Sequence, residues 1–398
     1  MLSRRTFLGA TLAWAAMPWP GRSWAWAAPG AGPEAPVLVV VFLRGAADGL
    51  SIVAPYQEAR YHDLRPNLAL GRPGTEGGLL DLEPRFGLHP ALSPLLPWYR
   101  DGRLAFVHAA GSPDPTRSHF DAQDYMETGK PGDRSAREGW LNRGLAALGA
   151  TGNFAGVALT PVQPVIFGGP ERFLCVPDLR ALSVRGGQAV TARFEEMYAG
   201  AVQQVLGRAG RDAFAAVDET RGGRLARVGA GSGYPRGRLG LTLSDIARLI
   251  RSGVGTRLAF TDAGGWDTHT RQGPVLAERL AELGSALAAF AADLGPLFDR
   301  TIVLVLSEFG RTVAENGTRG TDHGHGGVIW ALGGRLRGGR VCGKWPGLAE
   351  DALFEGRDLA VTTDFRDVVG EVWARHMGPG AERLFPGYSG GGAVGLFG

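Results

Sequence analysis

The stretch Val37-Leu38-Val39-Val40-Val41-Phe42-Leu43 decides the fold class of this chain. An unbroken apolar run rich in valine is typical of a β-strand that is buried on both faces. Such strands occur in parallel sheets whose two faces are covered by helices. The polar segment Arg44-Gly45-Ala46-Ala47-Asp48-Gly49 follows at once, so Arg44 and Asp48 are expected just beyond the carboxyl end of this strand.

Similar apolar runs recur along the chain and alternate with stretches of helical character. The runs are residues 104–109, 257–261, 301–306 and 328–332, and the helical stretches are residues 90–99, 118–128, 241–251 and 275–298. From Leu276 to Leu297, large apolar residues recur every three or four positions, which gives one apolar face for packing on a sheet. Strands that alternate with helices predict an α/β sandwich with a doubly wound sheet.

The chain divides into three parts on composition, and the third contains an insertion. Residues 1–27 have the character of an export signal, and residues 28–36 form a linker rich in proline, glycine and alanine. Residues 37–398 are expected to form one α/β domain. Within it, residues 150–235 begin rich in glycine and proline and then become helical, so we predict an inserted cap there.

The N-terminal residues match a signal for export. The twin arginine in Ser3-Arg4-Arg5-Thr6-Phe7-Leu8 precedes a short apolar stretch and the small-residue site Ala25-Trp26-Ala27. This order is the pattern of a bacterial twin-arginine (Tat) signal peptide. A membrane-spanning helix is the alternative, but spanning needs about 20 apolar residues, and Pro18 and Pro20 interrupt this run. We therefore expect export by the Tat machinery to the periplasm or the extracellular space, without stable membrane insertion.

The charge balance argues against nucleic acid as a partner. The chain has 42 basic and 39 acidic residues, a formal net charge of +3. Arg4, Arg5 and Arg22 lie in the predicted signal, so the remaining chain has 39 of each sign. No basic stripe with interleaved aromatic residues is evident. Two cysteines, Cys175 and Cys342, leave open one disulfide or two free thiols.

Residues that can bind metals or act as nucleophiles gather after the predicted strands. Sites in open α/β sheets form at the carboxyl ends of the strands, so these residues should share one edge. The candidates are Arg44, Asp48, Ser118, His119, Asp267, His269, Glu308, Arg311, Asp322, His323 and His325. Four of the eight histidines of the chain fall in these loops, which packing does not explain.

Each candidate also has a purely structural interpretation. Asp48 and Asp267 suit turns or helix caps, and Glu308 with Arg311 suits a solvated ion pair. Ser118-His119 suits either a helix N-cap or an anion site at a helix N-terminus. The segment 322–325 (DHGH) is harder to explain without a metal, because two histidines among glycines have no apolar face to pack on.

Five ordered motifs resemble the DUF1501 family of exported bacterial proteins, which is grouped with the alkaline phosphatase/sulfatase superfamily. They are residues 42–51 (FLRGAADGLS), 117–124 (RSHFDAQD), 265–269 (GWDTH), 307–312 (SEFGRT) and 320–324 (GTDHG). The resemblance covers essentially the whole chain after the signal. It implies a three-layer αβα sandwich with a mostly parallel sheet, metal ligands at strand ends and a nucleophile at a helix start.

The resemblance also implies roles for individual residues. Asp48 and Asp267 match metal-binding aspartates, Ser118 or His119 falls near the nucleophile, and His323 matches a late histidine. Glu308 stands where an aspartate usually ends its strand. The superfamily often has a histidine four residues after its aspartate and an Asp-His pair at a strand end, where this chain has Arg271 and Glu308-Phe309.

Two functional hypotheses follow. The first is an exported hydrolase of phosphate or sulfate esters, in which Ser118 attacks and Arg44 or Arg311 binds the anionic group. A divalent metal (zinc, calcium or magnesium) would be held by Asp267, His269, Glu308 and His323, with Asp48, Asp322 and His325 as further candidate ligands. The second is a catalytically degenerate exported protein that binds an anionic glycan or an envelope partner, which the missing strand-end histidine motivates.

Overall fold

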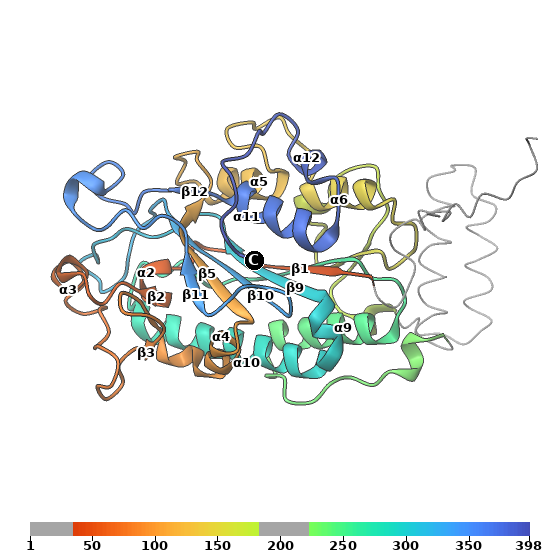
Figure 1. The fold of residues 1–398 in the computed structure, drawn as a ribbon, viewed down its shortest axis with the longest axis horizontal. Coiled ribbons are helices and arrows are strands. Elements are labelled where there is room, and N and C mark those ends of the chain that lie inside the picture. The colour runs from red at the N-terminus through yellow and green to blue at the C-terminus, as the bar shows by residue number, and fades with distance from the viewer. Residues whose placement is uncertain (1–34, 183–222) are drawn as a thin grey trace, which may run out of the picture.

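The structure, a computed structural model, describes residues 35–182 and 223–398 and is built around one large sheet (Figure 1). Nine strands of these residues form the sheet in the order β11-β5-β10-β9-β1-β8-β6-β7, with β12 beside β5. The strands are β1 (Val37–Leu43), β5 (Leu104–Gly111), β6 (Gly156–Leu159), β7 (Leu174–Val176), β8 (Leu258–Ala263), β9 (Thr301–Ser307), β10 (Gly327–Gly333), β11 (Arg340–Cys342) and β12 (Thr363–Asp364). The predicted signal peptide and nearly all of the predicted linker lie outside the described residues.

The first quoted stretch is the central strand β1, and both of its faces are buried. Val37, Val39 and Val41 point into one hydrophobic core, and the alternate residues Leu38 and Val40 point into a second core on the opposite face. β1 pairs in parallel with β8 on one side and with β9 on the other. A strand in this position has no solvent-facing side chains, which explains its continuous apolar sequence.

Helices cover both faces of the sheet (Figure 1). α5, α6, α11 and α12 lie on one side, and α4, α9 and α10 lie on the other. Their bounds are α4 (Leu96–Arg100), α5 (His119–Thr128), α6 (Trp140–Leu148), α9 (Arg238–Ser252), α10 (Gln272–Leu294), α11 (Phe365–Val372) and α12 (Ala381–Leu384), and the short helices α2 (Gly49–Ile52) and α3 (Ala59–Leu64) precede them. The predicted fold class, a three-layer α/β sandwich with a mostly parallel sheet, is confirmed.

Helix α10 is the predicted amphipathic helix, and its apolar face is buried. Leu276, Leu280, Leu283 and Leu287 all belong to the same core as the odd-numbered side chains of β1. Together with the following turn, this helix is long and apolar enough to cross a membrane by length and composition alone. Its leucine face instead contacts α9 and the sheet core.

The strand directions bring the predicted site loops to one edge. β10 is antiparallel to β5 and β9, and the other pairings in the sheet are parallel. The carboxyl ends of β1, β5, β8 and β9 therefore lie at the same edge. Because β10 runs in the opposite direction, it starts at that edge, so the loop of residues 308–326 stays there throughout.

Part of the predicted cap belongs to the sheet. β6 pairs in parallel with β8, and β7 pairs in parallel with β6, so residues 156–176 extend the main sheet at one end. The segment 150–235, where we predicted an inserted cap, thus contains two short strands that its glycine- and proline-rich sequence did not reveal. The following helical stretch lies mostly in residues 183–222, outside the described residues. Cys175 in β7 and Cys342 in β11 are both free thiols at opposite ends of the strand order.

A second, small sheet lies beside the main one. It consists of β2 (Val53–Ala54), β4 (Gly87–Leu88) and β3 (Leu80–Asp81), joined in antiparallel pairs. His108 of β5 reaches this sheet, where its Nε2 donates to the carbonyl of Val53 at 2.9 Å and its Nδ1 accepts from the N–H of Ala109 at 2.9 Å. Burial lowers the pKa of His108 to about 4, so this histidine is neutral near pH 7.

Candidate metal centre

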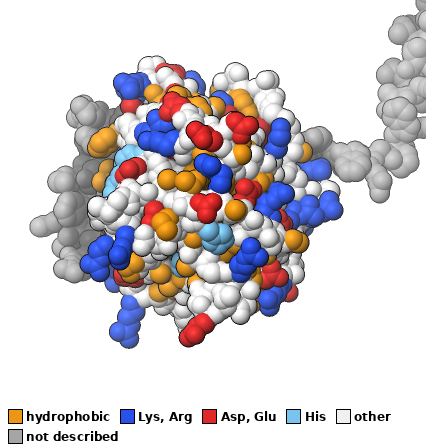
Figure 2. All heavy atoms as spheres, turned by 90° about the vertical axis from the view of Figure 1, so that its left-hand side faces the viewer, with side chains coloured by type: hydrophobic (Ala, Val, Ile, Leu, Met, Phe, Trp, Pro, Cys, Tyr) orange, Lys and Arg blue, Asp and Glu red, His pale blue; other side chains and the backbone are white. Residues whose placement is uncertain are grey.

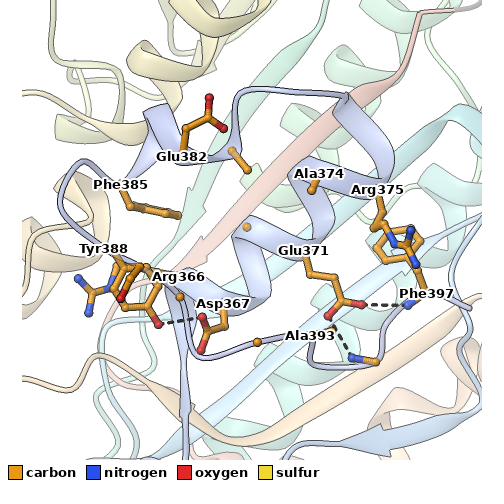
Figure 3. A pocket seen from close by; sticks show the side chains of 16 residues that line it. Arg366, Asp367, Glu371, Ala374, Arg375, Glu382, Phe385, Tyr388, Ala393 and Phe397 are labelled. Carbon is orange, nitrogen blue, oxygen red and sulfur yellow. Dashed lines mark hydrogen bonds between the residues drawn. The ribbon is translucent and has the colours of Figure 1, made fainter.

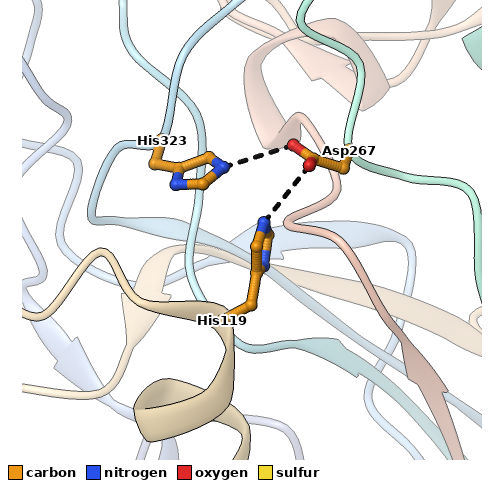
Figure 4. A group of neighbouring side chains, drawn as sticks. All are labelled: His119, Asp267 and His323. Carbon is orange, nitrogen blue, oxygen red and sulfur yellow. Dashed lines mark hydrogen bonds and ion pairs between the residues drawn. The ribbon is translucent and has the colours of Figure 1, made fainter.

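Two loops and one helix start bring His119, Asp267 and His323 together (Figure 4). His119 is the first residue of α5, directly after the N-cap Ser118, whose Oγ accepts from the N–H of Asp121. Asp267 follows β8, and His323 precedes β10. Each therefore lies at the edge where the parallel strands end.

The ligand atoms of these three residues all lie within 4.8 Å of one another. The Nε2 atoms of His323 and His119 lie 3.2 Å and 3.5 Å from the two carboxylate oxygens of Asp267. His269 adds a third imidazole, because its Nε2 lies 3.0 Å from Asp267 Oδ1 and 3.0 Å from His323 Nε2. Three side chains thus point nitrogen or oxygen atoms at one small volume, and His269 lies beside it, in contact with Asp267 and His323.

The far side of each imidazole is anchored by an oxygen acceptor. His323 Nδ1 donates to the carbonyl of Arg117 at 2.9 Å. His119 Nδ1 donates to Glu308 Oε1 at 2.8 Å, and His269 Nδ1 donates to Asp322 Oδ1 at 2.8 Å. In neutral histidine only one ring nitrogen carries hydrogen, so these bonds leave Nε2 with a free lone pair in all three rings.

The Nε2 atoms of these three histidines lack hydrogen-bond donors among the described residues. His119 Nε2 is buried without a hydrogen-bond partner among the described residues. The facing Nε2 atoms of His269 and His323 would present two lone pairs to each other at 3.0 Å. Buried polar atoms normally have partners, and a cation between His119, Asp267 and His323 would satisfy the nitrogens of these two histidines.

Glu308 is the buried anchor of the site. Its side chain is fully buried, and Oε1 also accepts from the backbone N–H of Gly45 at 2.8 Å and from Gln123 Nε2 at 2.9 Å. Burial acts to raise its pKa, but the hydrogen bonds from His119 and Gln123 outweigh it and hold the pKa below the usual range. The hydrogen bond to Glu308 in turn raises the pKa of His119.

Gly45 is required by the close approach of two loops. Its φ is +118°, and a Cβ there would lie 2.5 Å from the backbone nitrogen of Asp267. Only glycine combines this backbone conformation with such an approach. The loop after β1 thereby supports both Glu308 and the segment that carries Asp267.

Arg311 orients the carboxylate of Asp267 through a hydrogen bond. Its Nη1 lies 2.7 Å from Asp267 Oδ1, and its Nε donates to Thr321 Oγ1 at 3.1 Å. The hydrogen bond and charge of Arg311 outweigh partial burial and lower the pKa of Asp267. Thr321 donates to Gln272 Oε1 at 2.6 Å, and Gln272 donates to Asp48 at 2.6 Å, so a buried polar chain runs from Asp267 to Asp48.

The loop between β9 and β10 folds back on itself to place His323. Arg311 and His323 form an isolated antiparallel bridge, and the N–H of Gly324 donates to the carbonyl of Gly310 at 2.9 Å. A Cβ at Gly324 would lie 2.4 Å from the backbone carbon of Arg311. The glycines that we noted around the two histidines therefore allow backbone contact.

Several predicted site residues lie outside this group. Asp48 forms a fully buried ion pair with Arg65 at 2.6 Å, and the pKa of Asp48 is lowered because Arg65 and its hydrogen bonds outweigh burial. Glu308 and Asp322 contact histidine Nδ1 atoms and not the shared volume. His325 is buried against Phe354, with ring centres 4.5 Å apart.

Both predicted anion-binding arginines are already engaged. Arg44 contacts Asp262 at 2.6 Å, Glu127 at 2.8 Å and Gln123 at 2.8 Å through its three nitrogens. Arg311 is equally saturated by Asp267 and Thr321. The structure therefore gives these two side chains partners within the protein, and they position other groups.

The residues missed by sequence reasoning are the neutral and cationic side chains that hydrogen-bond to the candidate carboxylates Glu308 and Asp48. Gln123 lies four residues after His119 on α5, so a helical spacing could have paired it with the histidine. Arg65 and Gln272 carry no such signal, because nothing in the sequence links them to Asp48. A cavity of about 590 Å³ lies beside α11, and none of the predicted site residues lines it (Figure 3).

The sequence profile of the DUF1501 family, described as "Protein of unknown function (DUF1501)", matches residues 105–384. The chain belongs to the DUF1501 family. Its matched region includes the strands and loops that supply all three histidines and Asp267. No curated protein matches this DUF1501 sequence.

Solved structures similar to this DUF1501 chain include the following three, all of low sequence identity. The C-terminal periplasmic domain of EcEptC from Escherichia coli, in complex with Zn, has 8% identity and a TM-score of 0.36 and covers 75% of this chain and 73% of that one. A mutant of TAB5 alkaline phosphatase with bound Mg has 12% identity and a TM-score of 0.32, with 75% and 90% covered. A phosphonate monoester hydrolase of Agrobacterium radiobacter has 10% identity and a TM-score of 0.32, with 89% and 78% covered.

Proposed function

We propose that this protein is an exported, metal-dependent hydrolase of phosphate or sulfate esters. The observation that carries the proposal is the convergence of three Nδ1-anchored imidazoles on Asp267. Asp267 is partly exposed, with 45% of its side chain accessible, so the group opens to solvent and to a substrate. An anchored donor set at an accessible edge of an α/β sheet is typical of a catalytic metal site.

The donor set favours zinc over calcium or magnesium. Calcium and magnesium prefer oxygen ligands, whereas zinc accepts imidazole nitrogen together with carboxylate. Zinc–nitrogen bonds of about 2.0–2.1 Å in tetrahedral geometry imply neighbouring ligand atoms about 3.3 Å apart. The separations from Asp267 to the three Nε2 atoms are 3.0, 3.2 and 3.5 Å, which fits this spacing.

The residues of this chain have distinct parts in the proposed reaction. When bound, a divalent metal would polarise the ester oxygen and increase the acidity of an attacking hydroxyl or water. Ser118 is the candidate nucleophile, because it precedes His119 at the start of α5. The first N–H groups of this helix lack intrahelical acceptors and favour an anionic group. Glu308 and Asp322 fix the imidazole rings.

The test combines elemental analysis with turnover. The purified protein should bind zinc and hydrolyse an aryl phosphate or an aryl sulfate, and His323→Ala should lose both properties. His325→Ala is the matched control, because that histidine lies in the same loop but packs on Phe354. A metal-free protein that is inert toward both esters would overturn the proposal.

A binding protein without catalysis is the second candidate. The full engagement of Arg44 and Arg311 by carboxylates favours it, because neither guanidinium is free to hold a substrate anion. In that case an anionic glycan should bind with unchanged affinity after treatment with a chelator and in Ser118→Ala. Turnover that is lost on either change decides for the hydrolase.

The export route is part of the same proposal. The twin arginine at residues 4 and 5 predicts export by the Tat machinery, with the folded protein released into the periplasm or the extracellular space. The described surface suits a solvated protein, since acidic and basic side chains are interspersed on the face in Figure 2. Replacing both arginines by lysine should retain the protein in the cytoplasm, and unchanged export in that variant would contradict the Tat route.

A further inference from the structure

A separate cavity of about 390 Å³ lies next to the candidate metal centre. One wall is α5, which contributes Phe120, Gln123 and Glu127, and the opposite wall is the segment 160–165 after β6. Arg44 and Arg238 complete it near the end of β8. Its volume falls in the range of about 300–1,000 Å³ that is common for small-molecule sites.

The rim of this cavity bears unusually exposed apolar side chains. Phe120 is 87% exposed and Val162 is 76% exposed, whereas the next most exposed large apolar side chain of the described residues, Leu241, is 44% exposed. Phe120 and Val162 come from distant segments, yet both line the same cavity. Exposed apolar residues that converge in this way mark a site for an apolar ligand.

The charges of the cavity do not favour an anion. Two arginines and three carboxylates line it, so the acidic groups outnumber the basic ones. Arg44 is held by Glu127 and Asp262, and Arg238 pairs with Asp262 at 2.9 Å. No positive charge is in excess, so the phosphate or sulfate group of an ester would be disfavoured inside this cavity.

The cavity and the histidine group share structural parts. Gln123 lines the cavity and donates to Glu308, the carboxylate that holds His119. Phe120 directly follows His119 at the start of α5. A ligand held between Phe120 and Val162 is therefore next to the helix turn that carries a proposed metal ligand.

We propose that this cavity, the Phe120–Val162 pocket, binds the uncharged apolar alcohol part of the ester substrate, such as an aryl group. The inference rests on the proposed function for the anionic half of the substrate, which would lie at the histidine group. The enzyme then selects esters by their aromatic or aliphatic portion. Small polar esters gain nothing from the pocket.

Equilibrium binding tests the pocket without requiring catalysis. The fluorescent alcohol 2-naphthol should bind to the full protein, and Phe120→Ala or Val162→Ala should each weaken its binding at least about fivefold. Both side chains are exposed, so neither substitution is expected to affect folding. Leu241→Ala is the matched control and should leave the affinity unchanged. The anion 2-naphthalenesulfonate, of the same ring size, should bind about tenfold more weakly than 2-naphthol.

Turnover provides the second readout. For 2-naphthyl phosphate or sulfate, whichever is hydrolysed, Phe120→Ala should raise KM about fivefold with kcat nearly unchanged, and methyl phosphate or sulfate should show no such change. Naphthol binding that is absent, or that is insensitive to both rim substitutions, overturns the pocket. Binding that behaves as expected in a protein without any esterase activity supports the pocket and refutes only the proposed function.

Discussion

Replacing Glu308 by glutamine would remove the charge behind His119 while keeping the three hydrogen bonds that Oε1 accepts. The amide oxygen can still accept from His119, Gly45 and Gln123, as Oε1 does now. The new NH₂ would face Ser307 Oγ, which lies 2.8 Å from Oε2 and already donates to a backbone carbonyl. Only one of the two N–H groups of the new NH₂ can donate to Ser307 Oγ, so the second buried N–H lacks a partner and the free energy of unfolding should fall by about 1–3 kcal/mol.

The effect on zinc affinity is measured separately from the effect on stability, in the folded protein. Outer hydrogen-bond partners of metal-bound histidines typically contribute 10- to 100-fold to metal affinity, on the order of 1.4–2.8 kcal/mol. Two of the three imidazoles are anchored by carboxylates, through Glu308 and Asp322, and Glu308→Gln neutralises one of them. We therefore expect the lower end of the range, about a tenfold weaker affinity.

Titration of the metal-free protein with zinc against a competing chelator at pH 7 would measure this change. Glu371→Gln is the matched control, because that carboxylate accepts backbone N–H groups of the C-terminal segment, including that of Phe397, beside α11 (Figure 3). Its zinc affinity should equal that of the unchanged protein. Equal affinities for Glu308→Gln and the unchanged protein would refute the assignment of Glu308 as the anchor of a metal-binding histidine.

Three further outcomes follow from the structure. Burial lowers the pKa of His108 to about 4 in the folded state, whereas the unfolded chain binds this proton near pH 6.5. His108 therefore contributes about 3 kcal/mol to the free energy of unfolding above pH 6.5, and this contribution is lost as the pH falls to 4. Urea unfolding at pH 6.5 and at pH 4 should show a smaller loss of stability in His108→Gln than in the unchanged protein. Gly45→Ala should lower the melting temperature more than Gly74→Ala, because both have positive φ but only Gly45 lacks space for a Cβ. His323→Ala should abolish zinc binding in elemental analysis, and His325→Ala should retain it.

The fold was predictable because burial on both faces leaves a strong pattern in a strand. β1 and β9 are continuous apolar runs, and their ends could be placed within one or two residues. β6 and β7 were not predicted, since they are four and three residues long at the end of the sheet, within a glycine- and proline-rich segment. β6 owes its pairing to β8 and β7 owes its pairing to β6, and the local sequence does not encode either contact.

The edge of the sheet was predictable, but the partners of each side chain were not. Strand order alone places Asp48 and Asp267 at the same edge, and both look like candidate ligands in the sequence. Arg65 separates their roles, because it pairs with Asp48 and leaves Asp267 to face the histidines. Arg65 belongs to a segment without motif character, so no local pattern reveals this pairing. Contacts between distant segments decide which carboxylate faces the histidines.

The buried polar chain from Asp267 through Arg311, Thr321 and Gln272 to Asp48 affects how the centre would exchange its metal. Each proposed metal ligand is held by hydrogen bonds to other protein groups, so the orientation of its side chain does not depend on the bound ion. Small zinc domains lose their fold with the metal, because the ion is their main cross-link. Here the hydrophobic cores on both faces of the sheet hold the chain together. We therefore expect loading and removal of the ion to be reversible in the folded protein.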